Sequence, residues 1–116
     1  MHVEMRLLFR TSERKARTVV DKIARAADAG LDVVSCEAYP KDHRLVTCIV
    51  RCTLDESSVG DAMAETIRIN GFVAQRWTVE VPHYSDNGQF EFRGAAPVAQ
   101  LRVPGLAYAD FRLSNF

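Results

Sequence analysis

The sequence predicts an α+β fold, because two segments with helical periodicity lie among segments whose apolar residues alternate. Residues 3–9 alternate like a half-buried strand, and the apolar residues of 16–27 recur at helical spacing. Two further strand-like runs, a second helix and a fourth strand follow. This order, β-α-β-β-α-β, is that of the ferredoxin-like sandwich, with an antiparallel sheet and two helices on one face. We expect that fold, with an extra C-terminal hairpin.

The first strand is expected over residues 3–10, followed by a helix with a polar N-cap. Thr11 or Ser12 can accept a hydrogen bond from the first turn of this helix, and Gly30 is expected to end it in a left-handed conformation. The outer face of the helix is charged. Its charged residues are Arg14, Lys15, Arg17, Asp21, Lys22, Arg25 and Asp28. They form either a basic docking patch or a solvated face, and the interleaved acids favour the solvated face.

Two strands, 32–39 and 45–53, are predicted around a polar turn at 40–44. With the turn near its centre, Cys36 lies opposite Cys48, and the apolar residues of both strands share one face. We expect these cysteines to be small core residues, although they are close enough to pair.

The second helix is expected to begin at Asp55 and to close at Asn70-Gly71, with the fourth strand over 72–81. A polar turn over 82–88 should lead into a fifth strand, Gln89 to Arg93, which Gly94 to Pro97 break. Residues 106–113 alternate weakly. Residues 1–116 thus form one domain, with a core over 1–81 and a C-terminal strand extension over 82–116.

Composition excludes several classes of function. Fifteen basic residues balance fifteen acidic ones, so no overall field attracts the chain to nucleic acid or to an anionic membrane. No segment approaches the ~20 apolar residues of a spanning helix. Three cysteines leave one without a partner, which argues against a secreted disulfide framework. We therefore expect a cytoplasmic protein.

Residues able to do chemistry are scattered. His83, Ser85 and Asp86 lie on one turn, whereas catalytic triads hold their members on separate rigid elements. Glu80 and Glu91 become neighbours if their strands pair, but cross-strand pairing with arginines explains them better than glycosidase chemistry. Neither metal-ligand spacing nor a phosphate-binding glycine loop is found in the sequence. We expect no catalytic residue, no metal site and no cofactor.

The C-terminal third holds most of the aromatic residues, together with acids and amides. This mixture is typical of a protein-binding surface, although the aromatics could also form a second small core. We expect the aromatics to divide, with Trp77, Phe90 and Phe92 inward and Tyr84 and Tyr108 outward. The expected partner-binding residues are Tyr84, Asp86, Asn87, Glu91, Tyr108 and Asp110.

Two segments, Arg76-Trp77-Thr78-Val79-Glu80-Val81-Pro82 and Gly105-Leu106-Ala107-Tyr108-Ala109-Asp110-Phe111, resemble the small immunity proteins of bacterial toxin–immunity pairs of the contact-dependent inhibition type. The resemblance implies a cytoplasmic protein that binds and neutralises a cognate protein toxin. If that toxin is a nuclease, the outward acids Asp86, Glu91 and Asp110 could mimic a phosphate backbone.

Two alternatives remain open. The first is a small-molecule sensor or oligomerisation module like the ACT regulatory domains, which form homodimers. Those domains favour a glycine-bearing turn after the first strand, where this chain has Thr11-Ser12-Glu13. The second is an enzyme built on a dimeric ferredoxin-like barrel, which usually places polar residues inside the barrel. The inward positions here are nearly all apolar, so the enzyme ranks last.

Overall fold

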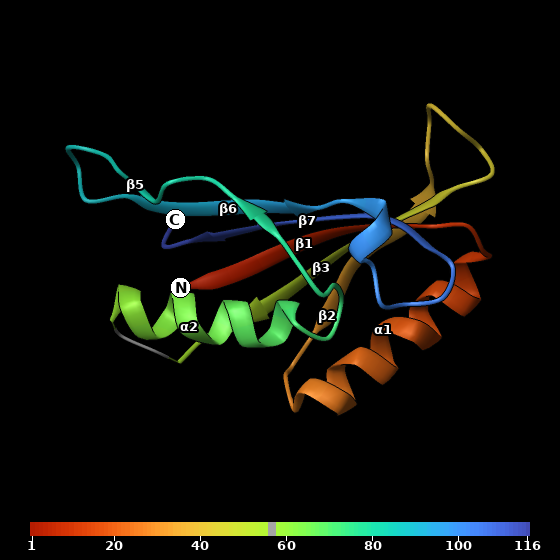
Figure 1. Ribbon diagram of the computed structural model, residues 1–116, viewed down its shortest axis with the longest axis horizontal. Coiled ribbons are helices and arrows are strands. Elements are labelled where there is room, and N and C mark those ends of the chain that lie inside the picture. Colours follow the sequence, from red (N-terminus) through yellow and green to blue (C-terminus); the bar gives the residue numbers. More distant parts are fainter. Residues whose placement is uncertain (56–57) are drawn as a thin grey trace.

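The computed structural model describes residues 1–55 and 58–116 and has an open antiparallel sheet with two helices on one face (Figure 1). In chain order the elements are β1 (His2–Phe9), α1 (Glu13–Ala27), β2 (Asp32–Ala38), β3 (Val46–Thr53), α2 (Val59–Asn70), β4 (Thr78–Val79), β5 (His83–Tyr84), β6 (Phe90–Ala96), the 3-10 helix η1 (Val98–Gln100) and β7 (Leu106–Ser114). The strand order is β2-β3-β1-β7-β6-β4, and β5 also pairs with β6. The α+β class is confirmed.

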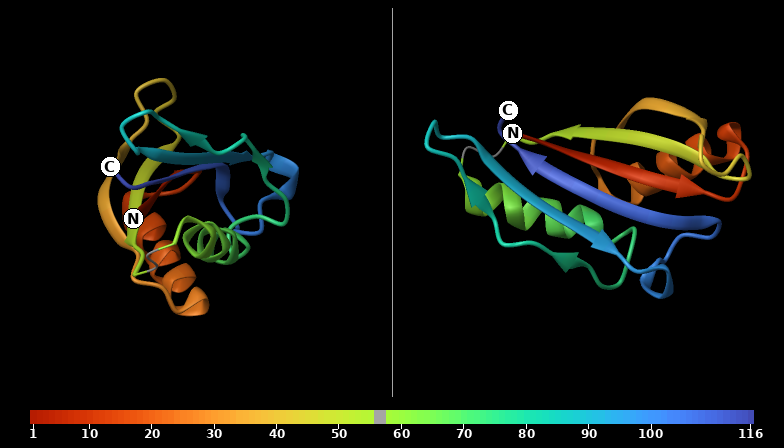
Figure 2. Two further views of the ribbon diagram at one scale, coloured as in Figure 1. Left: turned by 90° about the vertical axis from the view of Figure 1, so that its left-hand side faces the viewer. Right: turned by 90° about the horizontal axis from the view of Figure 1, so that it is seen from above.

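The core lies between the sheet and the helices (Figure 2). Phe9, Met5 and Leu7 of β1 are among its largest fully buried side chains, as alternation along that strand predicts. Helix α1 contributes a stripe at helical spacing, and its buried residues are Ala16, Val20, Ile23 and Ala27. No helix of residues 1–55 and 58–116 lies on the opposite face of the sheet (Figure 1).

The helix ends differ in part from the expected ones. Ser12 caps α1 as predicted, and its side chain accepts a hydrogen bond from Lys15 N. The left-handed residue at its C-terminus is Asp28, with φ 48°, so the expectation for Gly30 is wrong. Ser58 caps α2, and Asp55 therefore does not. The predicted closure at Asn70-Gly71 is confirmed, although Gly71 is right-handed.

The predicted strand over 72–81 is wrong. The chain leaves α2 through two tight turns, in which Phe72 N donates to Ile69 O and Val73 N donates to Asn70 O. Thr78 and Val79 form the strand β4 at the far edge of the sheet, and Ala74 forms an isolated bridge with Leu101. An alternating segment can form either an exposed edge strand or a central strand, so its periodicity alone does not tell which of the two it forms.

Strand β7 instead lies beside β1, with Phe111 opposite Met5 and Leu113 opposite Val3. Residues 82–116, expected as an addition to a complete sheet, thus supply a strand near its centre. Strand β6 also runs on through Gly94 to Ala96, so the expected break at Gly94 is wrong. A Cβ at Gly94 would lie 2.5 Å from Phe111 Cε1, so this position needs glycine for the ring to pack.

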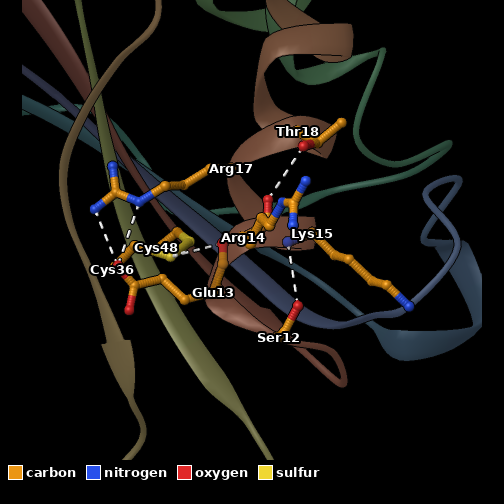
Figure 3. Close-up of a disulfide and its surroundings, with 8 residues drawn as sticks. All are labelled: Ser12, Glu13, Arg14, Lys15, Arg17, Thr18, Cys36 and Cys48. Carbon is orange, nitrogen blue, oxygen red and sulfur yellow. Dashed lines mark hydrogen bonds and ion pairs between the residues drawn. A yellow bond between two sulfur atoms is a disulfide. The ribbon is translucent and has the colours of Figure 1, made fainter.

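Cys36 and Cys48 lie opposite each other on β2 and β3, as predicted. The expectation that Val34 and Ala38 share their buried face is wrong, because the register shifts between Val33 and Ser35 and leaves Val34 exposed. The two cysteines form a disulfide with the Cα atoms 4.2 Å apart, so the expectation of two unbonded core residues is wrong. The bond lies under the first turn of α1, where Cys36 Sγ is 3.9 Å from Glu13 O (Figure 3).

Candidate functional site

The helix-free face of the sheet holds a shallow groove of about 660 Å³ over β1, β7, β6 and β4. Its side chains occupy the outward positions of strands whose inward positions form the core, so alternation alone makes this face polar. We call it the sheet groove. The lining residues used below are Glu4, Arg6, Arg93, Tyr108, Asp110 and Arg112.

Arg6 and Asp110 form the centre of the sheet groove. They are directly opposite on β1 and β7, and Asp110 Oδ2 accepts from Arg6 Nη2 at 2.6 Å and from Arg6 Nε at 3.1 Å. Tyr108 Oη donates to the same oxygen at 2.9 Å, and the Arg6 guanidinium lies 5.5 Å from the Tyr108 ring centroid. Both groups are thus held in fixed positions by Asp110.

These contacts also set the protonation of the groove. Partial burial, followed by the hydrogen bond to Asp110, raises the pKa of Tyr108 above its ordinary value. The hydrogen bond to Asp110 raises the pKa of Arg6. At neutral pH the groove therefore offers a neutral phenol and a permanent cation, which bind well but are poor proton acceptors.

A row of charges crosses the same face beside this centre. Glu4 lies between Arg51 of β3 and Arg112 of β7 and pairs with Arg51 at 2.9 Å. Arg112 is also directly opposite Arg93 of β6, whose Nε donates to Glu91. In the part of the chain that the structure describes, Arg112 has no ion pair within 4 Å. It is the cation of this row that remains available to an anionic group.

The predicted partner-binding residues fall into three groups. Tyr108 and Asp110 line the sheet groove, and Glu91 lies on the same face beside Arg93. Tyr84 is paired with Phe90, and their ring centroids are 4.9 Å apart, so its ring stands on the side of the buried Phe90.

The remaining two residues, Asp86 and Asn87, form the tip of the β5–β6 hairpin, which Gly88 closes with φ 80°. The Asn87 side chain accepts from Ser85 Oγ within the turn. The six predicted residues therefore do not form one patch. The expected inward position is confirmed for Phe90 and Phe92, which are buried, and for Trp77, which is partly buried against the core. Tyr108 lies outward as expected, whereas Tyr84 is exposed but stands on the side of Phe90.

Sequence reasoning missed Arg6, Glu4 and Arg112. The outward positions of Arg6 and Glu4 on the first strand can be read from its alternation. Whether they belong to a site, however, depends on which strand lies beside them. Strand β7 was not expected there, so the pairing of Arg6 with Asp110 could not be foreseen.

In the structure, the residues considered for hydrolysis do not bond to one another as a catalytic triad would. Ser85 Oγ bonds to Asn87 and to the Gln89 backbone, not to His83. Within residues 1–55 and 58–116, no group of three or more His, Cys, Asp or Glu side chains is placed to hold a metal ion. Over the same residues, no helix is both long and apolar enough to cross a membrane.

Comparison with known proteins adds no relative. No family model, no curated protein and no solved structure matches this chain.

Proposed function

We propose that this chain is a non-enzymatic protein-binding domain, and that its partner is a protein toxin which it neutralises as an immunity protein does. The observation that carries the proposal is the fixed arrangement of Arg6, Tyr108 and Asp110 on the helix-free face. Arginine and tyrosine are the residues that most often dominate protein interfaces, and here they are ordered before any partner arrives.

The pattern of charge supports a protein rather than a small molecule as partner. Charges of both signs lie side by side over several strands, and the sheet groove is wide and shallow. A ligand that matches such a surface must itself display several charges in a rigid order. Folded proteins do this, and the match suppresses wrong partners.

We do not propose that Asp86, Glu91 and Asp110 together mimic the phosphates of a nucleic acid. Asp110 is paired with Arg6, and Glu91 is paired with Arg93. Among the described residues, Asp86 at the hairpin tip has no ion pair within 4 Å. If the toxin is a nuclease, Asp86 is the acid able to meet its phosphate-binding cations.

The ferredoxin-like arrangement is part of the same proposal, with β7 in place of the fourth strand. The order β2-β3-β1-β7 with every pair antiparallel supports it. The cytoplasmic address also remains a proposal, and the Cys36–Cys48 bond weighs against it because disulfides persist in oxidising compartments.

The test pairs the chain with the C-terminal domain of a large secreted protein encoded beside it. Co-expression should rescue growth of cells that make this domain, and titration calorimetry should give a 1:1 complex with Kd on the order of 10⁻⁹ M. A homodimer whose melting temperature rises on adding an amino acid, with no complex, would instead support the ACT-like sensor and contradict the proposal.

Two sets of variants locate the contact. Tyr108→Phe with Arg112→Gln removes a hydroxyl and a charge from the sheet groove, and Tyr84→Ala with Asp86→Ala alters the hairpin. Each pair should weaken binding by about 2 kcal/mol or more, as hot-spot residues do. Lys41→Glu, in the distant β2–β3 turn, is the control and should bind normally. A pair of variants that binds like the control excludes its surface from the contact.

A further inference from the structure

A second groove, of about 740 Å³, lies between the first half of α1 and the loop at residues 104–105. We call it the α1 groove. Four cations line it, Arg10, Arg14, Lys15 and Lys22, and none of the acidic residues that the structure describes does. The net balance of charge over the chain therefore hides a local cationic cluster.

The acid in the first turn of α1 is directed elsewhere. Glu13 pairs with Arg17 on the side of the helix that faces the disulfide, whereas Lys15 points away from that side (Figure 3). Across residues 1–55 and 58–116, no ion pair within 4 Å involves any of the four cations of the α1 groove. Glu13 is thus neutralised by Arg17 away from the α1 groove, and the four cations that line the groove keep their charge available.

The cations stand in a line that an extended ligand can follow. Lys15 and Lys22 are seven residues apart, which separates them by roughly 10 Å along the helix axis. The opposite wall is held by a backbone hydrogen bond of 2.7 Å from Arg10 N to Gly105 O. Gly105 has φ 83°, so this wall has a conformation that suits glycine. Both walls are therefore fixed before a ligand binds.

The lining favours carboxylates on a peptide over phosphates. One of the first three amides of α1 is already used, because Lys15 N donates to Ser12 Oγ. This capping leaves fewer amides for a phosphate than an uncapped helix end would offer. Val19 and Pro104 add apolar surface between the cations, which suits a chain that alternates acidic and apolar side chains.

We propose that the α1 groove binds an acidic, partly apolar peptide segment of a partner protein. The segment would lie along α1, with its carboxylates on Arg14, Lys15 and Lys22 and its apolar side chains against Val19 and Pro104. The groove lies at the end of the molecule away from the β5–β6 hairpin (Figure 1), so this proposal does not depend on the toxin as partner.

Fluorescence anisotropy with a labelled peptide of Glu-Glu-Leu repeats tests the proposal on the full chain. Binding should weaken about tenfold or more in Lys15→Glu with Lys22→Glu, and should fall as salt screens the charges. Lys15→Met with Lys22→Met keeps the apolar stems and should weaken binding less, while circular dichroism verifies folding. The matched control, Lys41→Glu with Arg76→Glu, changes net charge equally outside the groove and should bind as the unaltered chain does.

Three results would overturn the proposal. Equal weakening in both charge-reversed proteins would mean that only net charge matters. Tighter binding of a single-stranded DNA oligonucleotide than of the peptide would assign the groove to nucleic acid. If the peptide does not bind even at about 1 mM protein, the affinity is too weak for a specific binding site. None of these results bears on complex formation with the toxin domain, so the two proposals fail separately.

Discussion

Arg68 of α2 joins the two helices, because its Nη1 donates to the carbonyl oxygen of Ala27, the last residue of α1, at 2.6 Å. The same guanidinium pairs with Glu65 one turn earlier on α2. A cation at the C-terminal end of a helix satisfies an orphan carbonyl and opposes the helix dipole. The two helices are thus linked by one charged side chain at the edge of the core.

Arg68→Ala should lower the urea midpoint of unfolding, because the Ala27 carbonyl loses its partner. Glu65→Gln keeps that bond and should cost less than about 0.5 kcal/mol. The hydrogen bond from Arg68 lowers the pKa of Glu65 below 4.5, so its stabilising effect is present at neutral pH and is lost as pH falls through the lowered value. An equal cost for both substitutions would contradict this assignment.

Two glycines should respond to alanine in opposite directions. Gly94→Ala places a Cβ against the Phe111 ring and should destabilise the protein by roughly 1–3 kcal/mol through overpacking. Gly60 lies in the first turn of α2 with nothing within 4 Å of its would-be Cβ, so Gly60→Ala should stabilise it by about 0.5 kcal/mol. Thermal melts of both variants test the pair. A stabilised Gly94→Ala protein would show that the ring moves aside freely.

Reduction of the Cys36–Cys48 bond should lower stability, because the bond closes a loop between residues 12 positions apart. The chain-entropy model gives about 2–3 kcal/mol for a loop of this size. Denaturant titrations with and without reductant measure the difference, and Cys52→Ser, which lies outside the bond, is the control. If protein isolated from the native cell without oxidant already has three reactive thiols when denatured, the bond is not formed there and the cytoplasmic proposal gains support.

The stability provided by Tyr108 should depend on pH in the alkaline range. Its pKa is raised in the folded protein above the ordinary value of 10.0, so the folded state favours the neutral phenol. The stabilisation is complete below about pH 10 and is lost as pH rises through the raised value. Urea midpoints of the unaltered protein and of Tyr108→Phe should therefore converge as pH approaches the upper end of this range. Midpoints that stay equally separated would mean that the hydroxyl does not couple to folding.

The candidate site was predictable only in part. Tyr108 and Asp110 are outward residues of an alternating segment, and the sequence indicates this side of the strand directly. Their arrangement as a site depends on Arg6, which binds Asp110 although it is 104 residues away along the chain. No local pattern connects two positions so far apart, because each strand can satisfy its own alternation beside several different neighbours.

The sequence by itself determined the order of elements from β1 to β3 and the opposition of Cys36 and Cys48, because a short turn between two alternating segments leaves few registers. It did not predict the register shift between Val33 and Ser35, which leaves Val34 exposed. Only the tertiary structure decided that β7 rather than residues 72–81 pairs with β1, and that Arg10 and the loop at 104–105 join cations of α1 in one groove. Both outcomes depend on long-range packing: a strand near the centre of the sheet needs hydrogen-bond partners on both sides and an apolar face, such as that of Phe111 against Gly94, that fits the core.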